Sequence, residues 1–232
     1  MTAFREQLRQ VFVVNKFFLL LAALVVTLVC APVLDDGGLV GRMMHLTCLT
    51  LVILAAVAAN RARKGMFWAG VFIAAVALPV LWSDAAFQSE LLTIVRLLVS
   101  ALFFVSMASV ILVAVFRDDH TPVQAIFGAI CSYLLIGLAW AMIYAAIEHV
   151  DDNPFAVAHR RTVGTEGSEF TAFSQLIYFS FVTMSTLGYG DISPRSPFAE
   201  SATWMQSVTG QFYLAVLVAR LIAVLPVARR EA

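Results

Sequence analysis

Long apolar runs separated by short charged breaks limit what this chain can fold into more than any other feature. Most of these runs approach the ~20 residues that one bilayer crossing needs. The chain is also 61% hydrophobic and only 13% charged, which is far more apolar than a soluble domain. We therefore predict an all-α membrane protein with six transmembrane helices, over residues 17–34, 39–59, 66–82, 91–116, 123–147 and 198–225. The third run is the shortest, and Pro79 is expected to end or bend its helix.

The basic residues sort to one side of these runs. If the N-terminus is cytoplasmic, nine Lys and Arg residues fall in cytoplasmic segments and four fall outside. This distribution follows the positive-inside rule. We therefore expect a multi-pass protein of the cell membrane, in contact with lipid, with both termini in the cytoplasm. The formal net charge is zero, and no Lys/Arg run is long enough to attract nucleic acid.

The segment between the fifth and sixth runs has a different character. Residues 170–194 are too short and too mixed to cross a bilayer. Their apolar part, 173–184, predicts a short helix, and the string Thr186-Leu187-Gly188-Tyr189-Gly190-Asp191 follows it. Non-helical backbone at membrane depth is tolerated where it lines a water-filled path. We therefore expect a re-entrant helix and loop that line such a path.

This six-residue string resembles the selectivity filter of potassium channels, which usually reads Thr-Val-Gly-Tyr-Gly-Asp. The chain as a whole also looks like the six-helix, prokaryotic-type members of that family, with the best resemblance over residues 123–225. The resemblance implies a homotetrameric, potassium-selective channel that conducts K+ passively and is not an enzyme. It implies K+ ions in the filter and no organic cofactor. The implied ligands are the backbone carbonyls of Thr186, Leu187, Gly188 and Tyr189, with Gly190 completing the filter.

The residue types fit this chemistry. A potassium ion must exchange its water shell for other oxygens, and rings of backbone carbonyls supply them. Carbonyls that all point inward require unusual backbone angles at alternate residues, which Gly188 and Gly190 adopt without steric cost. Thr186 can add its hydroxyl oxygen at the inner end, while Leu187 and Tyr189 are expected to point away from the axis. Leu187 replaces the usual Val, a change that leaves its carbonyl in place.

Residues around the filter are expected to support it. Tyr178 stands where the family often has a Trp whose ring N–H bonds the filter aspartate, so we expect its hydroxyl to reach the Asp191 carboxylate. The alternative is that Tyr178 packs on lipid or on a neighbouring helix. Val182 stands where some relatives carry a Glu. Val182 and the next residue, Thr183, are both expected to be among the residues that support the filter. Glu148, near the end of the fifth helix, is expected to cap backbone amides near the outer mouth.

The sixth helix is expected to carry the gate. Gly210 stands where the family commonly has a glycine hinge, and a glycine inside a helix costs up to ~1 kcal/mol relative to Ala. Close packing against the pore helix is an alternative reason for this glycine. Arg220 is expected to reach the inner headgroups or a neighbouring subunit. The apolar side chains that could converge on the axis and close the path by dewetting are Leu217, Leu221, Val224 and Leu225.

The chain divides into two expected parts: residues 1–120 resemble the four-helix voltage-sensor bundle, and residues 121–232 form the pore domain. Voltage-gated relatives carry Arg or Lys at every third position of the fourth helix, whereas residues 91–116 contain only Arg96. Moving one charge across the whole membrane changes the free energy of gating by ~2.3 kcal/mol per 100 mV at most, so strong voltage gating is not expected. Arg96 has a simpler role available, by reaching outward or by pairing with Asp84 or Glu90.

Other classes of function fit the sequence less well. Residues 188–191 also fit the Gly-x-Gly-Asp of intramembrane aspartyl proteases, but such enzymes need a second carboxylate nearby. Every other Asp and Glu of this chain lies at a helix end or in a loop. A secondary transporter would need paired inverted halves with broken helices, which the sequence lacks. A non-conducting or regulatory channel-like subunit fits the same fold, although an intact filter argues against it.

Overall fold

The computed structural model describes residues 16–35, 38–59, 64–82, 90–116, 122–158, 162–163, 170–171 and 173–224, and these residues are mostly helical. The helices are α2 (Lys16–Asp35), α3 (Gly38–Ala59), α4 (Lys64–Trp82), α5 (Glu90–Phe116), α6 (Pro122–Val150), α7 (Phe173–Met184) and α8 (Pro197–Val224). The strands are β1 (Phe155–Val157), β2 (Thr162–Val163), β3 (Phe170–Thr171) and β4 (Ile192–Pro194).

The helices follow the apolar runs of the sequence. Each predicted span corresponds to one helix, and so does the predicted short helix over 173–184. Helix α4 continues through Pro79 to its end at Trp82, so Pro79 does not end the helix, and a bend at this residue stays a prediction. Among the described residues, two helices are long and apolar enough to cross a membrane, Glu90–Phe116 and Gln124–Val150. Crossing of the bilayer by all six helices therefore stays a proposal.

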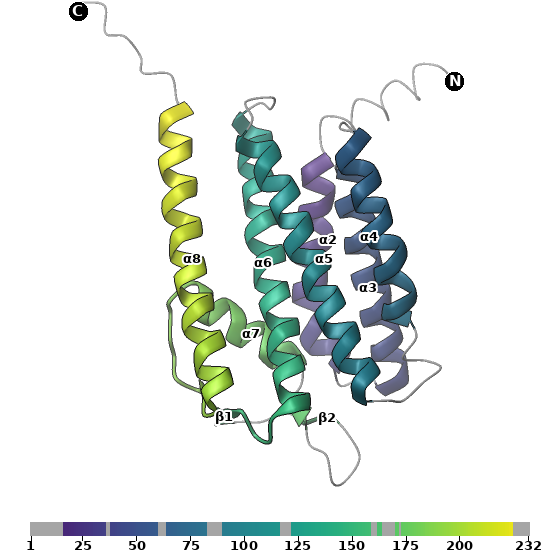
Figure 1. Cartoon of the computed structure of the whole chain (residues 1–232), viewed down its shortest axis with the longest axis vertical. Coiled ribbons are helices and arrows are strands. Elements are labelled where there is room, and N and C mark those ends of the chain that lie inside the picture. The colour runs from purple at the N-terminus through teal and green to yellow at the C-terminus, as the bar shows by residue number, and fades with distance from the viewer. Residues whose placement is uncertain are drawn as a thin grey trace, which may run out of the picture.

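The four helices α2 to α5 form a bundle that packs against α6 (Figure 1). Only residues 117–121 separate α5 from α6, and so short a connection makes two helices antiparallel neighbours. The shared core contains large, fully buried side chains from both helices, among them Phe103, Phe104, Met107, Leu135 and Leu138. Because α2 also contacts α6 and α7, the bundle rests on the C-terminal part of its own chain.

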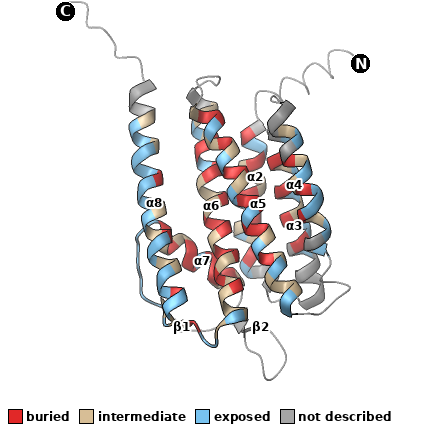
Figure 2. Ribbon diagram, in the orientation of Figure 1, coloured by how far each residue is buried: buried red, intermediate tan, exposed pale blue. Residues whose placement is uncertain are grey.

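Helix α7 is short and lies at one end of the molecule, in contact with α2, α6 and α8 (Figure 1). Gly137 of α6 allows this close approach, because a Cβ at that position would lie 2.6 Å from Cζ of Phe181. Helix α8 presents much of its surface to the outside (Figure 2). The first residues of α2 and the last residues of α8 lie at the same end of the molecule (Figure 1).

Local sequence signals fix where α8 begins. Pro197 takes the first helical position, where its missing N–H is not needed. The Ser196 hydroxyl accepts a hydrogen bond of 3.2 Å from the Ala199 backbone N–H, as an N-cap residue does. Glu200 adds a negative charge in the first turn, where it interacts favourably with the positive end of the helix dipole. The start of α8 is therefore fixed a few residues after β4.

Two small sheets accompany the helices. Strand β1 pairs antiparallel with β4, with Phe155 opposite Pro194 and Val157 opposite Ile192. Strand β2 pairs antiparallel with β3, with Thr162 opposite Thr171. Strands of two or three residues are too short to leave an alternation pattern in a sequence. The partners in the first sheet are also far apart along the chain, so the sequence held no signal for them.

Candidate functional site

The loop after α7 has an alternating backbone. Thr186, Gly188 and Gly190 have positive φ angles of 57°, 61° and 79°, whereas Leu187 and Tyr189 between them do not. In an ordinary extended chain the backbone angles repeat, and successive residues face opposite sides. Alternating the sign of φ instead turns successive carbonyl groups toward one side. The loop can therefore present a row of backbone oxygens along one face.

The backbone angle, not crowding, demands glycine at two of these positions. A Cβ added to Gly188 or Gly190 would meet nothing within 4 Å in the single chain. A positive φ favours glycine whatever the free space around it. Thr186 adopts a positive φ in spite of its side chain, at a cost on the order of 1–3 kcal/mol. Its backbone N–H donates to the Thr183 carbonyl at 3.0 Å and its hydroxyl donates to the Ser185 carbonyl at 2.7 Å.

The last turn of α7 holds the start of this loop. The backbone N–H groups of Ser185 and Leu187 donate to the carbonyls of Phe181 and Val182, both at 3.0 Å. Together with the bond from Thr186 to Thr183, they satisfy carbonyls that a helix end leaves unpaired. Val182 and Thr183, two of the expected support residues, therefore contact the loop through their backbone oxygens.

Tyr178 of α7 lies beside the loop. Its ring is parallel to that of Tyr189 within 4°, with the ring centroids 6.5 Å apart. The Asp191 carboxylate lies near enough to the Tyr178 side chain for the two to interact electrostatically. Asp191 Oδ1 also accepts a hydrogen bond of 3.1 Å from the Ile192 backbone N–H. Tyr178 and Asp191 therefore lie near each other, and the hydrogen bond between them stays a prediction. The capping role of Glu148 stays a prediction.

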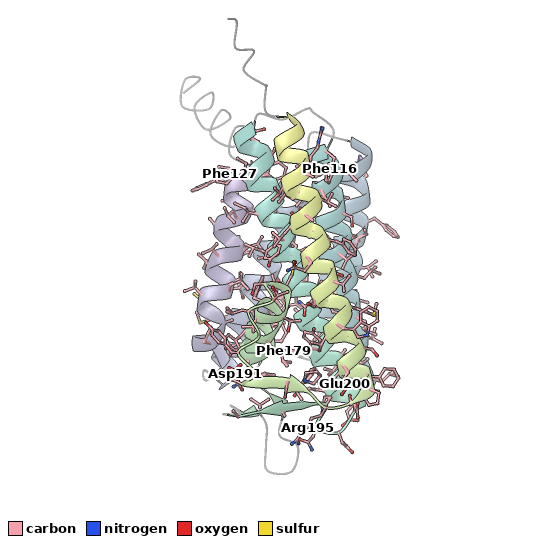
Figure 3. The ribbon with its side chains drawn as sticks, turned by 90° about the vertical axis from the view of Figure 1, so that its left-hand side faces the viewer. Phe116, Phe127, Phe179, Asp191, Arg195 and Glu200 are labelled. Carbon is pink, nitrogen blue, oxygen red and sulfur yellow. The ribbon has the colours of Figure 1, made fainter. Side chains whose placement is uncertain are left out.

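Strand β1 holds the Asp191 end of the loop, and sequence reasoning missed this contact. The Ala158 backbone N–H donates to the Asp191 carbonyl at 2.9 Å, and the Arg195 N–H donates to the Pro154 carbonyl at 2.7 Å. Phe155 of β1 is buried against the rings of Tyr144 and Phe179, at centroid distances of 5.4 and 5.3 Å. Figure 3 shows Asp191 and Arg195 at the strand end of the molecule, opposite Phe116.

Gln211 of α8 lies at the other end of the loop. Its Nε2 donates to the Thr186 hydroxyl at 3.4 Å. A polar side chain directly after Gly210, in a largely apolar stretch of helix, is the signal that could have identified it. Leu214 and Val218 follow at helical spacing and are exposed with it. This face of α8 therefore continues away from the Thr186 end of the loop.

The predicted gate residues have mixed outcomes. Gly210 packs directly on the end of α7, with the Met184 backbone where its Cβ would be. Leu217 is half-buried, unlike the exposed Leu214 and Val218 on either side of it. The side chains of Leu221 and Val224, and the whole of Leu225, lie outside the described residues.

Arg220 has a partner that the sequence did not predict. Its Nη2 donates to the Phe116 carbonyl at 2.9 Å. Phe116 is the last residue of α5, and a cation is favourable at a helix C-terminus. Arg220 therefore ties the C-terminal part of α8 to the helical bundle within the same chain.

Comparison with known proteins identifies the part of the chain that carries this loop. Residues 128–226 match the family model described as ion channel. This match supports an ion channel. It covers most of α6 and all of α7, the loop and α8, which is less than half of the chain.

One curated relative adds detail to this match. The chain is 38% identical over 60 residues to the potassium voltage-gated channel protein shk-1 of Caenorhabditis elegans. The aligned part is 26% of this chain and 11% of that protein. This chain therefore spans about a tenth of the length of the relative it matches. No solved structure matches this chain.

Proposed function

We propose that this chain is one subunit of a potassium-selective ion channel, in which four copies surround an axis through residues 186–190. The observation that carries the proposal is the alternation of φ at Thr186, Gly188 and Gly190. It gives the loop the row of backbone oxygens that a dehydrated potassium ion needs. The similarity to a potassium voltage-gated channel supports K+ as the ion. An ion channel needs no catalytic residue, and the proposal includes no enzyme activity.

The exposure of the loop supports assembly. Leu187 and Tyr189 are 56% and 67% exposed in the single chain, although large side chains of this kind are usually covered. Large apolar side chains along α8 are exposed as well, among them Phe198, Trp204, Met205, Val208 and Phe212. Lipid and neighbouring copies together would cover these surfaces. One chain supplies one quarter of a carbonyl ring, and a four-fold heterologous interface closes it.

The contacts of α8 suggest which side chains line the path below the filter. Gln211 reaches Thr186, so the helix face that carries Gln211, Leu214 and Val218 is the proposed pore face. Leu217 lies on a neighbouring face and is half-buried, and its place in the gate stays a prediction. The bundle of α2 to α5 would then lie outside the pore, with Arg96 as its one basic residue in α5.

Flux from reconstituted protein tests this proposal. Purified protein in liposomes should carry K+ down its gradient and should carry Na+ far more slowly, and native mass spectrometry in mild detergent should give a tetramer. A non-conducting subunit would assemble without flux. Equal K+ and Na+ flux, or K+ flux from a monomer, would contradict the proposed filter.

A further inference from the structure

A buried chain of hydrogen bonds joins α6, α7 and α8 beside the filter loop. The Tyr144 hydroxyl donates to Gln206 Oε1. Gln206 Nε2 donates to the Ser180 carbonyl at 3.0 Å and to the Ser180 hydroxyl at 2.7 Å. The Ser180 hydroxyl donates in turn to the Gly137 carbonyl at 2.6 Å. Tyr144, Ser180 and Gln206 are each 0% exposed.

The donors and acceptors along these hydrogen bonds allow one orientation of the Gln206 amide. Both Nε2 hydrogens have acceptors and Oε1 has a donor. A flipped amide would point its oxygen at the Ser180 carbonyl, which can only accept. The amide therefore holds Tyr144 of α6 and Ser180 of α7 at set positions on α8.

Burial of this amide calls for a reason beyond packing. An unpaired amide is costly to remove from water, and paired ones contribute little more than an apolar side chain would. What a satisfied buried polar network adds is one defined arrangement of the parts that it joins. Gln206 joins three helices in this way, although sequence reasoning did not single it out.

Two contacts on one face of α8 reach the helix that holds the filter loop. Gln206 bonds Ser180, and Gly210, four residues later, touches Met184. Residues four apart lie on the same face of a helix. Between Ser180 and Met184 lie the carbonyls that receive the N–H groups of Ser185, Thr186 and Leu187. A shift of α7 on α8 therefore moves the loop backbone.

We propose that Gln206 is a positioning residue for potassium selectivity. Its amide sets the place of α7 on α8, and thereby the spacing of the carbonyl oxygens of residues 186–190. This inference rests on the proposed function. It predicts that the loss of the amide changes the relative permeability of K+ and Na+, which a purely structural bond would leave unchanged.

The first test replaces the amide by an apolar side chain of similar length. Gln206→Met should still assemble, but its K+/Na+ permeability ratio should fall on the order of tenfold, the scale on which one buried hydrogen bond changes an equilibrium. Ser132→Ala is the matched control. Ser132 is equally buried, and its hydroxyl donates to carbonyls of α6 and α5 at 3.0 and 3.3 Å, away from α7. Ser132→Ala should lose about as much thermal stability as Gln206→Met but should keep the wild-type K+/Na+ permeability ratio.

The second test uses pH, and it stands if the methionine variant fails to assemble. In Gln206→Glu, a neutral carboxyl group keeps one donor for Ser180, whereas a carboxylate has none and faces the Ser180 carbonyl. Burial favours the neutral form, so the ratio should fall as the pH rises. The wild-type ratio should stay constant over the same range. Among the described contacts of this position, Tyr144 is the titratable group that faces it.

The outcomes separate this inference from the proposed function. Wild-type protein that conducts K+ selectively, with Gln206 variants that lose selectivity as described, supports both. Selective wild-type protein with unchanged ratios in Gln206→Met and in Gln206→Glu at every pH overturns the role of Gln206 alone. Wild-type protein without K+ selectivity overturns the proposed function and this inference with it.

Discussion

Gly210 of α8 lies against the backbone of Met184 at the end of α7, so closely that a Cβ on Gly210 would overlap the Met184 carbonyl oxygen and lie 2.9 Å from its Cγ. Backbone oxygen cannot move aside as the end of a flexible side chain can. Close packing therefore accounts for this glycine, and bending need not be invoked. Any bend of α8 at Gly210 would also have to separate the two helices that meet there.

Gly210→Ala should destabilise the assembled protein by about 1–3 kcal/mol, the usual cost of forcing a methyl group into a packed site. Gly70→Ala is the control, because a Cβ there would lie 3.4 Å from the flexible end of Met107. Thermal melting in detergent should show a lower midpoint for Gly210→Ala than for Gly70→Ala. Equal midpoints would mean that α7 and α8 are not in contact at this point.

Gly190→Ala should reduce the selectivity for K+ over Na+ with little effect on assembly. The φ of 79° at Gly190 is unfavourable for alanine, although the space around a Cβ is open. The carbonyl should therefore turn away from its place in the row. Permeability ratios from liposome flux check this, with Gly70→Ala again as control. Unchanged selectivity in Gly190→Ala would count against a carbonyl-lined path.

Tyr178 and Asp191 should be energetically coupled. Tyr178→Phe removes the hydroxyl that is expected to bond the Asp191 carboxylate and keeps the ring that lies parallel to the Tyr189 ring. A double-mutant cycle with Asp191→Asn should give a coupling of about 1 kcal/mol in the stability of the tetramer, as expected for one hydrogen bond. Strictly additive effects of the two substitutions would show that the contact contributes nothing.

Arg220→Met should lower the melting temperature, because it removes the donor to the Phe116 carbonyl and keeps an apolar stem. A cation at a helix C-terminus contributes up to about 2 kcal/mol when partly buried. Arg220→Lys keeps the charge and should recover part of the loss. Arg195→Met, at an exposed arginine, is the control and should melt like the wild type. If Arg220→Met, Arg220→Lys and Arg195→Met all melt at the same temperature, the hydrogen bond from Arg220 to α5 does not stabilise the protein.

The sequence predicted the parts of this fold that depend on local pattern. Long apolar runs placed the long helices that the structure describes, and the predicted short helix coincides with α7. The two glycines of the loop have the positive φ angles that the motif suggested. These features depend on residues that are close in the chain, such as apolar stretches and glycine positions, so a single sequence carries them.

The missed features depend on pairs of residues that are distant in the chain. The bond from Ala158 to Asp191, the amide of Gln206 and the tie from Arg220 to Phe116 each join separate elements. Gln206 and Gln211 are polar residues in a largely apolar helix, but nothing local indicates which helix each one faces. Three-dimensional packing decides such contacts, and one sequence does not report it.

The central claim is that four copies of residues 186–190 form a path that admits K+ and rejects Na+. Its most direct measurement is the reversal potential across a planar bilayer with KCl on one side and NaCl on the other, using the purified wild-type protein. The account predicts a reversal potential set by K+, with current that flows only while the tetramer is intact. A reversal potential near zero, where both cations pass equally, would contradict it.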